Sequence, residues 1–230
     1  MNALLAFDTA TERTSIALAA RGRTWQQEGE GGARASAAFL PALLALLAEA
    51  DVKLADLDAI AFGRGPGAFT GLRVACAVAQ GLALGAVKPV LPIDTLLAIA
   101  EDARDGAESL RVWAVMDARM NEIYAAEYEF GASGWQVLSA PMLTNAAALN
   151  QLWRESEPQV VAGSAVAAFG DRLESAGARR LPEAAPRAIG MLALGRALFE
   201  AGGAVDAAVA LPLYLRDKVA LTSAEREDRQ

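Results

Sequence analysis

The segment from Leu57 to Ala86, LDAIAFGRGPGAFTGLRVACAVAQGLALGA, joins two apolar runs through a glycine-rich turn. The short first run predicts a buried strand, and the run from Gly71 onward predicts a helix of about four turns. Strand, turn and helix in this order are typical of an α/β fold. Because glycine-rich turns before helices also bind phosphates, the sequence of this one decides between two roles.

Two common phosphate-binding motifs do not fit this turn. A P-loop requires Lys and Ser or Thr directly after its last glycine, whereas Gly71 is followed by Leu72 and Arg73. The dinucleotide fingerprint fails because Thr70 stands where a third glycine is required. Thr70 can cap the helix, whose first N–H groups retain a general preference for anions. We therefore interpret the turn mainly as a device that lets the helix pack closely on its sheet.

The chain before and after this segment predicts two related halves. ALLAFDTA, TSIALAA and RTWQQEGE predict three strands, and a helix capped by Ser36 follows them, so the first half reads βββαβαβα. After a polar segment, RVWAVMDAR and EIYAAEYEF predict a hairpin. Both halves begin with a strand, a turn containing aspartate and a second strand, which indicates duplication of one α/β unit. We expect lobes over residues 1–105 and 106–221, and an irregular tail over 222–230.

Composition restricts the chemistry. The 230 residues include one cysteine and no histidine, which excludes an internal disulfide, a Ser-His-Asp system and imidazole zinc sites. The net charge of −7 argues against an electrostatic footprint for nucleic acid, so we expect little direct contact with nucleic acid. No apolar run of about 18 residues lacks a polar break, and Asp8 comes too early for a signal peptide. We expect a cytoplasmic protein that does not enter a membrane.

Two predicted helices have almost no polar side. The first offers none between Phe39 and Ala48, and the one from Gly71 offers only Arg73 and Gln80. A helix on a sheet normally shows one apolar and one polar stripe, so both helices should leave an apolar outer surface. Such surfaces usually bind another subunit. The alternative is that the second lobe covers these helices.

Asp8 ends the first predicted strand and is followed by Thr9 and Thr11. A carboxylate in this position, with hydroxyl and backbone groups nearby, suits a hydrated magnesium ion and a phosphate. The alternative is an Asx turn that closes the first hairpin. Asp117 is the counterpart in the second half, but residues 119–121 lack the glycines that close approach of a phosphate requires. This departure weakens the case for hydrolysis.

The motifs FDTAT (7–11), GPGAFTGLRVA (65–75), DARMNEIY (117–124) and PLYLRDKVA (212–220) resemble those of the bacterial TsaB family, also called YeaZ. The resemblance runs over almost the whole chain. It implies an actin/Hsp70-like (ASKHA) fold with two lobes of related α/β topology. It also implies a non-catalytic partner that activates TsaD, which forms threonylcarbamoyladenosine in tRNAs reading codons that begin with A. Relatives often carry a His-Ser pair before the first helix, where this chain has Arg-Ala-Ser at 34–36.

The same resemblance implies how the partner binds. The two apolar helices are expected to pack against the equivalent pair of TsaD, with the ATPase TsaE joining the assembly, and isolated chains are expected to form a homodimer through this surface. The expected interface comprises Phe39, Leu40, Leu43, Leu47, Leu72, Arg73, Ala75, Cys76, Ala79, Leu82 and Ala83.

The expected site has no catalytic residue, no resident metal and no required cofactor. Asp8, Thr9 and Thr11 are the candidates for holding a nucleotide, and a nucleotide with magnesium at the joint surface stays open. The competing hypothesis is an actin-like magnesium-dependent ATPase that uses Asp8. A metallopeptidase is disfavoured because the chain has no histidine.

Overall fold

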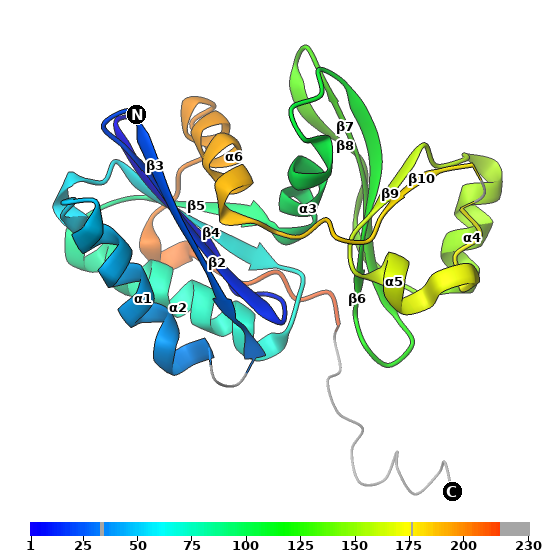
Figure 1. Cartoon of the computed structure of the whole chain (residues 1–230), viewed down its shortest axis with the longest axis horizontal. Helices are drawn as coiled ribbons and strands as arrows, with labels where there is room; N and C mark the ends of the chain where they lie inside the picture. The colour runs from blue at the N-terminus through cyan, green and yellow to red at the C-terminus, as the bar shows by residue number, and fades with distance from the viewer. Residues whose placement is uncertain (33–34, 176, 217–230) are drawn as a thin grey trace, which may run out of the picture.

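The computed structural model describes residues 1–32, 35–175 and 177–216, which form two lobes side by side, each built on a five-stranded sheet (Figure 1). The first sheet consists of β1 (Ala3–Asp8), β2 (Arg13–Ala20), β3 (Arg23–Glu30), β4 (Ala59–Gly65) and β5 (Val90–Asp94). The second consists of β6 (Leu110–Asp117), β7 (Ile123–Gly131), β8 (Gly134–Thr144), β9 (Val160–Ala162) and β10 (Arg179–Leu181).

Both sheets have the same topology. Their strand orders are β3-β2-β1-β4-β5 and, read from the other edge, β8-β7-β6-β9-β10. In each, the first three strands form an antiparallel meander, and the fourth and fifth run parallel to the first. The two predicted α/β halves therefore repeat one topology, as the duplicated sequence pattern indicates.

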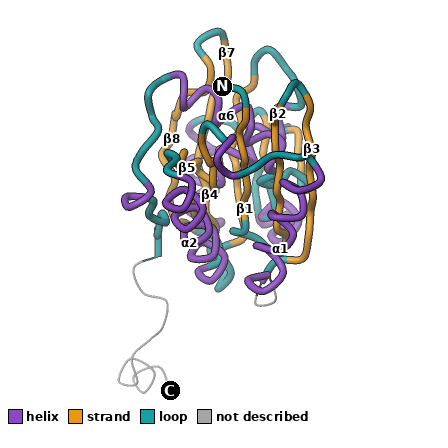
Figure 2. Tube along the Cα trace, turned by 90° about the vertical axis from the view of Figure 1, so that its left-hand side faces the viewer, coloured by secondary structure: helices purple, strands orange, loops and turns teal. Residues whose placement is uncertain are grey.

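Helices cover both faces of the first sheet. The helices of the molecule are α1 (Ala35–Glu49), α2 (Phe69–Ala86), α3 (Thr95–Arg104), α4 (Ala146–Glu155), α5 (Ala165–Phe169) and α6 (Ala188–Glu200), with short 3-10 turns η2 (Leu54–Asp56), η3 (Gly170–Arg172) and η4 (Ala207–Val209). On one face α1 and α2 lie next to each other (Figure 2). On the other face α6 and α3 pack between the sheets.

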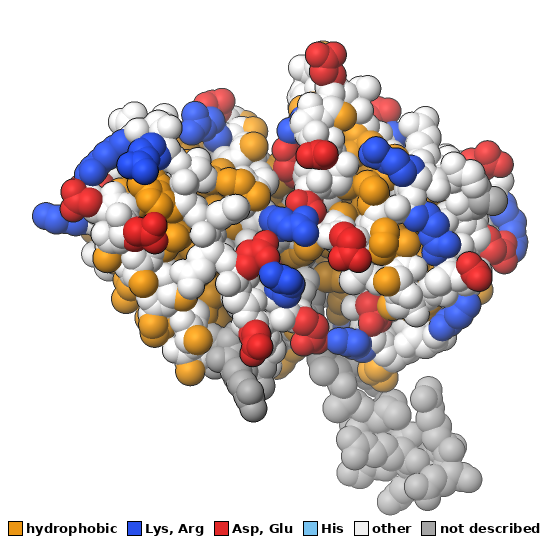
Figure 3. Space-filling view, viewed as in Figure 1, with side chains coloured by type: hydrophobic (Ala, Val, Ile, Leu, Met, Phe, Trp, Pro, Cys, Tyr) orange, Lys and Arg blue, Asp and Glu red, His pale blue; other side chains and the backbone are white. Residues whose placement is uncertain are grey.

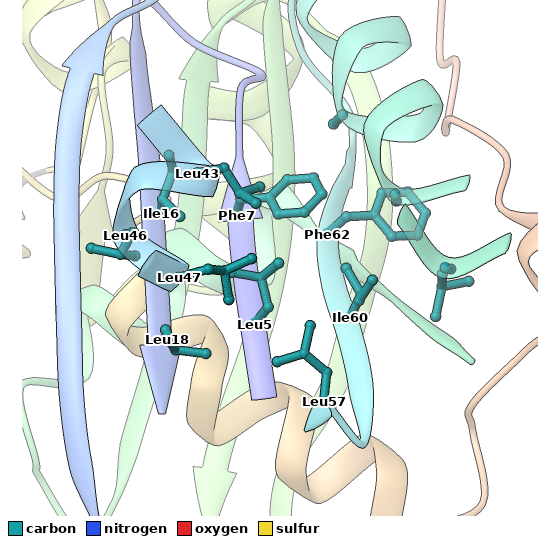
Figure 4. Close-up of a cluster of buried hydrophobic side chains, with 14 of the residues drawn as sticks. Leu5, Phe7, Ile16, Leu18, Leu43, Leu46, Leu47, Leu57, Ile60 and Phe62 are labelled. Atoms are coloured by element: carbon teal, nitrogen blue, oxygen red, sulfur yellow. The ribbon is translucent and has the colours of Figure 1, made fainter. Parts of the chain in front are cut away.

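The core under α1 shows why these segments fold together. Alternate residues of a strand point to opposite faces, so Leu5 and Phe7 of β1 meet α1, whereas the intervening side chains meet α6. Figure 4 shows Leu43 and Leu47 of α1 directed at these two side chains. Phe7 also lies beside Phe62 of the parallel strand β4. An apolar helix face on an alternating strand face thus fixes the position of α1.

The predicted lobe boundaries are wrong at the C-terminal side. The change of sheet falls between β5 and β6, close to residue 105, but α6 returns to pack on β1, β2, β4 and β5. Val205 then pairs with Val90 of β5, and η4 packs on α2. Residues 188–213 thus complete the first lobe rather than the second. The predicted tail, 222–230, lies outside the described residues.

Helix starts also differ from the sequence prediction. α2 begins at Phe69 after Ala68, and no side chain caps it, so Thr70 is the second helical residue and not the cap. α1 begins at Ala35 and continues through Pro41. The predicted Ser36 cap concerns a side chain outside the described part of the structure.

Candidate functional site

The side of α1 that points away from the sheet is apolar. Leu40 and Leu44 are 38% and 44% exposed, although leucine side chains are usually buried. The other exposed residues of the described helix are small or apolar up to Glu49: Ala37, Ala38, Pro41, Ala45 and Ala48. This side of the helix therefore offers one charge, at its C-terminal end.

The outward side of α2 continues this surface. Phe69 is 41% exposed at the start of the helix, and Leu84 and Val87 are 78% and 89% exposed at its end. Between them Ala77, Gly81 and Gly85 are exposed, which lets a partner approach the backbone closely. Arg73 is the one exposed charged residue of this helix. We call the exposed residues of α1 and α2, together with Val87, the outer helical face.

The described part of the second lobe does not cover this face. α1 packs on β2, β3 and α2, and α2 packs on β4, β5 and η4. In Figure 1 the second lobe lies on the opposite side of the first sheet. Figure 3 shows hydrophobic side chains gathered over α1 and α2, whereas acidic and basic side chains gather near the junction of the lobes. For the described residues, the alternative that the second lobe covers these helices is therefore wrong.

Most of the predicted interface residues nevertheless point inward. The buried ones are Phe39, Leu43, Leu47, Leu72, Ala75, Cys76, Ala79 and Ala83. They pack against the first lobe's own sheet, so their assignment to a partner surface is wrong. Leu40 and Arg73 are exposed, and Leu82 is partly buried. Burial raises the pKa of the Cys76 thiol to about 11, as expected for an unreactive core cysteine.

The prediction failed in its choice of helix side because both sides are apolar. It missed Leu44, Phe69, Leu84 and Val87, which are among the exposed large apolar residues of the outer helical face. One signal was available: Ala75, Ala79 and Ala83 recur every fourth residue, and such a stripe of small residues lets a helix lie close to a sheet. This alanine stripe identifies the inward side of α2, so Phe69 and Leu84, which lie off the stripe, belong to the outward side.

The glycine-rich turn serves the packing of α2. A Cβ atom at Gly71 would lie 1.9 Å from the carbonyl oxygen of Thr9, and one at Gly67 would lie 2.6 Å from the Cβ atom of Ala10. The hydroxyl of Thr9 donates a hydrogen bond of 2.7 Å to the Gly71 carbonyl oxygen. These contacts hold the N-terminus of α2 against the β1–β2 turn, which agrees with the structural interpretation of the glycines.

Asp8 is engaged within the first lobe. It is 1% exposed, and a Cβ atom at Gly63 would lie 1.8 Å from its carboxylate, so glycine provides its space. Its Oδ1 accepts the N–H of Ala10 at 2.7 Å, and its Oδ2 accepts the Thr95 hydroxyl at 2.8 Å. Burial raises the pKa of Asp8 to about 6, although both hydrogen bonds lower it. Asp8 therefore forms the Asx turn that the sequence left as an alternative.

The cleft between the lobes, about 830 Å³ in volume, receives Thr11 but neither Asp8 nor Thr9. The prediction that Asp8 and Thr9 hold a nucleotide is thus wrong for their side chains, which are buried and hydrogen-bonded elsewhere. At the cleft, Arg119 forms an ion pair of 2.8 Å with Glu12 of the opposite lobe.

The turn after β6 differs from a phosphate-binding turn. Arg119, Met120 and Asn121 all have positive φ, and the Arg119 N–H donates to the Asp117 carboxylate at 2.9 Å. A guanidinium and an exposed methionine thus occupy the position where small residues would be needed. Among the described residues, no group of three or more acidic, cysteine or histidine side chains is placed to hold a metal ion.

One helix, α2, is long and apolar enough to cross a membrane by length and composition alone. In this structure, one side of it packs on the first sheet through Ala75, Ala79 and Ala83.

Comparison with known proteins identifies the family. A family model described as TsaD, tRNA N6-adenosine threonylcarbamoyltransferase, matches residues 32–223. The "tRNA threonylcarbamoyladenosine biosynthesis protein TsaB" of Haemophilus influenzae is 36% identical over 225 residues, 94% of each chain. Its namesake from Escherichia coli is 34% identical over 94% of this chain and 96% of its own. The structure of YeaZ from Pseudomonas aeruginosa superposes with a TM-score of 0.85 at 34% identity, covering 94% of this chain and all of that one.

These matches and the repeated strand order confirm the predicted two-lobed actin/Hsp70-like (ASKHA) fold. Because two curated TsaB relatives match 94% of this chain at 34–36% identity and the family model matches residues 32–223, the chain belongs to the TsaB (YeaZ) family.

Proposed function

We propose that this chain is a non-catalytic partner in the synthesis of threonylcarbamoyladenosine in tRNA, and that its outer helical face binds a transferase of the TsaD type. The names of its relatives support the pathway. The observation that carries the binding role is the outer helical face itself, which stays exposed although Leu40, Leu44, Leu84 and Val87 lie on it. Burial of such side chains contributes about 1.5–3 kcal/mol each when complete.

The contacts of the two candidate aspartate turns support a non-catalytic role. Asp8, the residue that an actin-like ATPase would use, has both carboxylate oxygens engaged within its lobe. Arg119 occupies the second turn at the cleft. Since the sequence has no histidine, a metallopeptidase is also disfavoured. Purified chain is therefore expected to turn over no ATP, and a turnover that Asp8→Asn abolishes would favour the ATPase instead.

The partner gains from this contact through a shift in its conformational equilibrium. A protein that binds one conformation of its partner more tightly increases the population of that conformation. Here the outer helical face would bind the competent conformation of the transferase, with the ATPase TsaE joining the assembly. Without the transferase, the same face is expected to pair with a second copy. The tRNA substrate would place this work in the cytoplasm, and the net charge of −7 leaves most tRNA contacts to the partner.

Leu44→Glu tests this proposal. Leu44 is 44% exposed on α1, so a charge there is tolerated by the free chain but must be desolvated in the complex. Leu152→Glu is the matched control, because Leu152 is 40% exposed on α4 of the second lobe. In size-exclusion chromatography with the TsaD-type protein of the same organism, Leu44→Glu should elute uncomplexed and Leu152→Glu should co-elute. Equal complex formation by both would count against the outer helical face.

A further inference from the structure

Phe69, Arg73 and Tyr214 form an exposed cluster at the start of α2. The rings of Phe69 and Tyr214 lie 5.5 Å apart between centroids. The guanidinium of Arg73 lies 3.9 Å from the Phe69 ring centroid, and its Nε donates to the Tyr214 hydroxyl at 3.3 Å. Phe69 and Tyr214 are 41% and 44% exposed. Two aromatic residues from distant parts of the chain therefore hold one arginine in place on the surface.

Tyr214 belongs to a C-terminal segment, residues 205–214, that runs along α2. Val205 exchanges two hydrogen bonds of 2.9 Å with Val90, and Gln80 of α2 donates to the Ala210 carbonyl oxygen at 3.0 Å. The Leu213 N–H donates to the Arg64 carbonyl oxygen at 2.7 Å, beside the glycine-rich turn. Fixed backbone contacts at several points make this segment a regular part of the first lobe's surface.

The C-terminal segment widens the apolar surface beyond the two helices. Val209 and Leu211 are 58% and 66% exposed, and Tyr214 follows them. η4 packs on α2 and Val205 pairs with the edge strand β5, whereas α1 packs on β2 and β3, so this segment extends the first lobe's surface on the side of α2 away from α1. A partner that covers α1 and α2 would meet this segment as well.

Arg73 sets the charge that such a partner must carry. Among the described residues no carboxylate lies within 4.0 Å of its guanidinium, whereas Arg64, Arg104 and Arg187 all pair with carboxylates of this chain. Only the Nε of Arg73 donates to a described residue, so both terminal nitrogens stay available. Burying an unpaired guanidinium under an apolar surface is costly, but a held guanidinium binds a carboxylate with little further loss of freedom.

We infer that the C-terminal segment is a third docking element, and that the partner is an apolar surface carrying a carboxylate that pairs with Arg73. The inference rests on the proposed function, since it takes the TsaD-type transferase as the occupant. Arg73 and Tyr214 are of the residue types enriched among interface hot spots, and phenylalanine such as Phe69 is enriched in interfaces. Their cluster lies where α2 meets the C-terminal segment, so one anchor joins two of the three elements.

Binding of Arg73 and Tyr214 variants to the TsaD-type protein of the same organism tests the inference by isothermal titration calorimetry. Arg73→Glu should weaken binding about 100-fold, because the new glutamate would face the partner's carboxylate and the two like charges would repel. Arg73→Lys should weaken it about tenfold, since lysine cannot form the bidentate pair. Tyr214→Ala should also weaken it about tenfold by releasing the guanidinium. Arg23→Glu is the matched control, because Arg23 also lies over an aromatic ring, Trp25 at 5.2 Å, but on β3; its affinity should match that of the unaltered chain.

The outcomes separate this inference from the proposed function. If Leu44→Glu abolishes the complex while Arg73→Glu and Tyr214→Ala bind normally, the third docking element and its pairing with a partner carboxylate are refuted, but the role of the outer helical face is supported. If Leu44→Glu also binds normally, the proposed function fails. If Arg73→Glu weakens only self-association, measured by sedimentation, the occupant is a second copy and the inference is overturned.

Discussion

Replacing Gly71 with alanine tests whether the glycine-rich turn exists for packing. Gly71 lies in the first turn of α2, and a Cβ atom there would lie 1.9 Å from the carbonyl oxygen of Thr9 and 3.0 Å from its carbonyl carbon. The obstacle is backbone, so no side-chain rotation removes the clash. The N-terminus of α2 must therefore move away from the β1–β2 turn.

The expected loss of stability follows from the contacts that this movement breaks. They are the 2.7 Å bond from the Thr9 hydroxyl to the Gly71 carbonyl and the 2.8 Å bond from the Ala68 N–H to the Ala10 carbonyl. Two hydrogen bonds contribute about 2 kcal/mol, and the stranded Thr9 hydroxyl costs at least about 1 kcal/mol. The better helix propensity of alanine offsets about 1 kcal/mol. We expect a net loss of about 2 kcal/mol, or a Tm lower by about 4–8 °C.

Urea unfolding followed by circular dichroism measures this loss. Gly81→Ala is the control, because Gly81 lies in the same helix and a Cβ atom there would meet nothing within 4 Å. That variant should gain about 0.5–1 kcal/mol from helix propensity. A Gly71→Ala chain as stable as Gly81→Ala would refute the packing role of the turn. If the role is correct, Gly71→Ala also displaces Phe69 and Arg73 and weakens partner binding.

Two further predictions concern buried positions. Ala79→Glu should unfold the first lobe rather than merely block the partner, because Ala79 is 0% exposed against the sheet; a folded variant by circular dichroism would contradict the inward assignment. Asp8 has a folded pKa of about 6 against 3.8 in the unfolded chain, so the folded state binds more protons between these values. The stability that this group contributes is present below pH 4 and is lost as pH rises to about 6, by at most about 3 kcal/mol. When the free energy of unfolding in urea is measured against pH, Asp8→Asn should remove this decrease. An unchanged profile would show that Asp8 does not titrate in this range.

The order of elements was predictable because local patterns determine it. β1 to β3, the glycine-rich turn and α2 all follow from apolar periodicity and turn residues, and the related motifs of the second half follow in the same way. The return of α6 to the first sheet was not predictable from pattern alone. Its sequence specifies an apolar helix, but which of two similar sheets it covers depends on the connection after Leu181 and on space left beside α3.

The candidate site was predictable in kind but not in detail. Apolar residues on all sides of α1 and α2 indicated a covered surface, yet the same uniformity hid which leucines face the sheet. Leu43 and Leu47 are buried, whereas Leu40 and Leu44, each three residues before one of them, are exposed. The role of Asp8 depended on Thr95, which is far away in the sequence and becomes a neighbour only when β5 pairs with β4. Long-range contacts of this kind leave no local signal.

The path of the chain makes the second lobe an insertion in the first. The chain leaves the first sheet after α3, builds the second lobe, and comes back with α6. A fragment ending at residue 105 would leave Leu4, Ala61 and Leu91 without the α6 side chains that shield them, and it should aggregate. A chain in which a short linker replaces the second lobe would keep α6 on the first sheet, but it would expose Leu96 and Ile99 of α3, which pack against the second sheet.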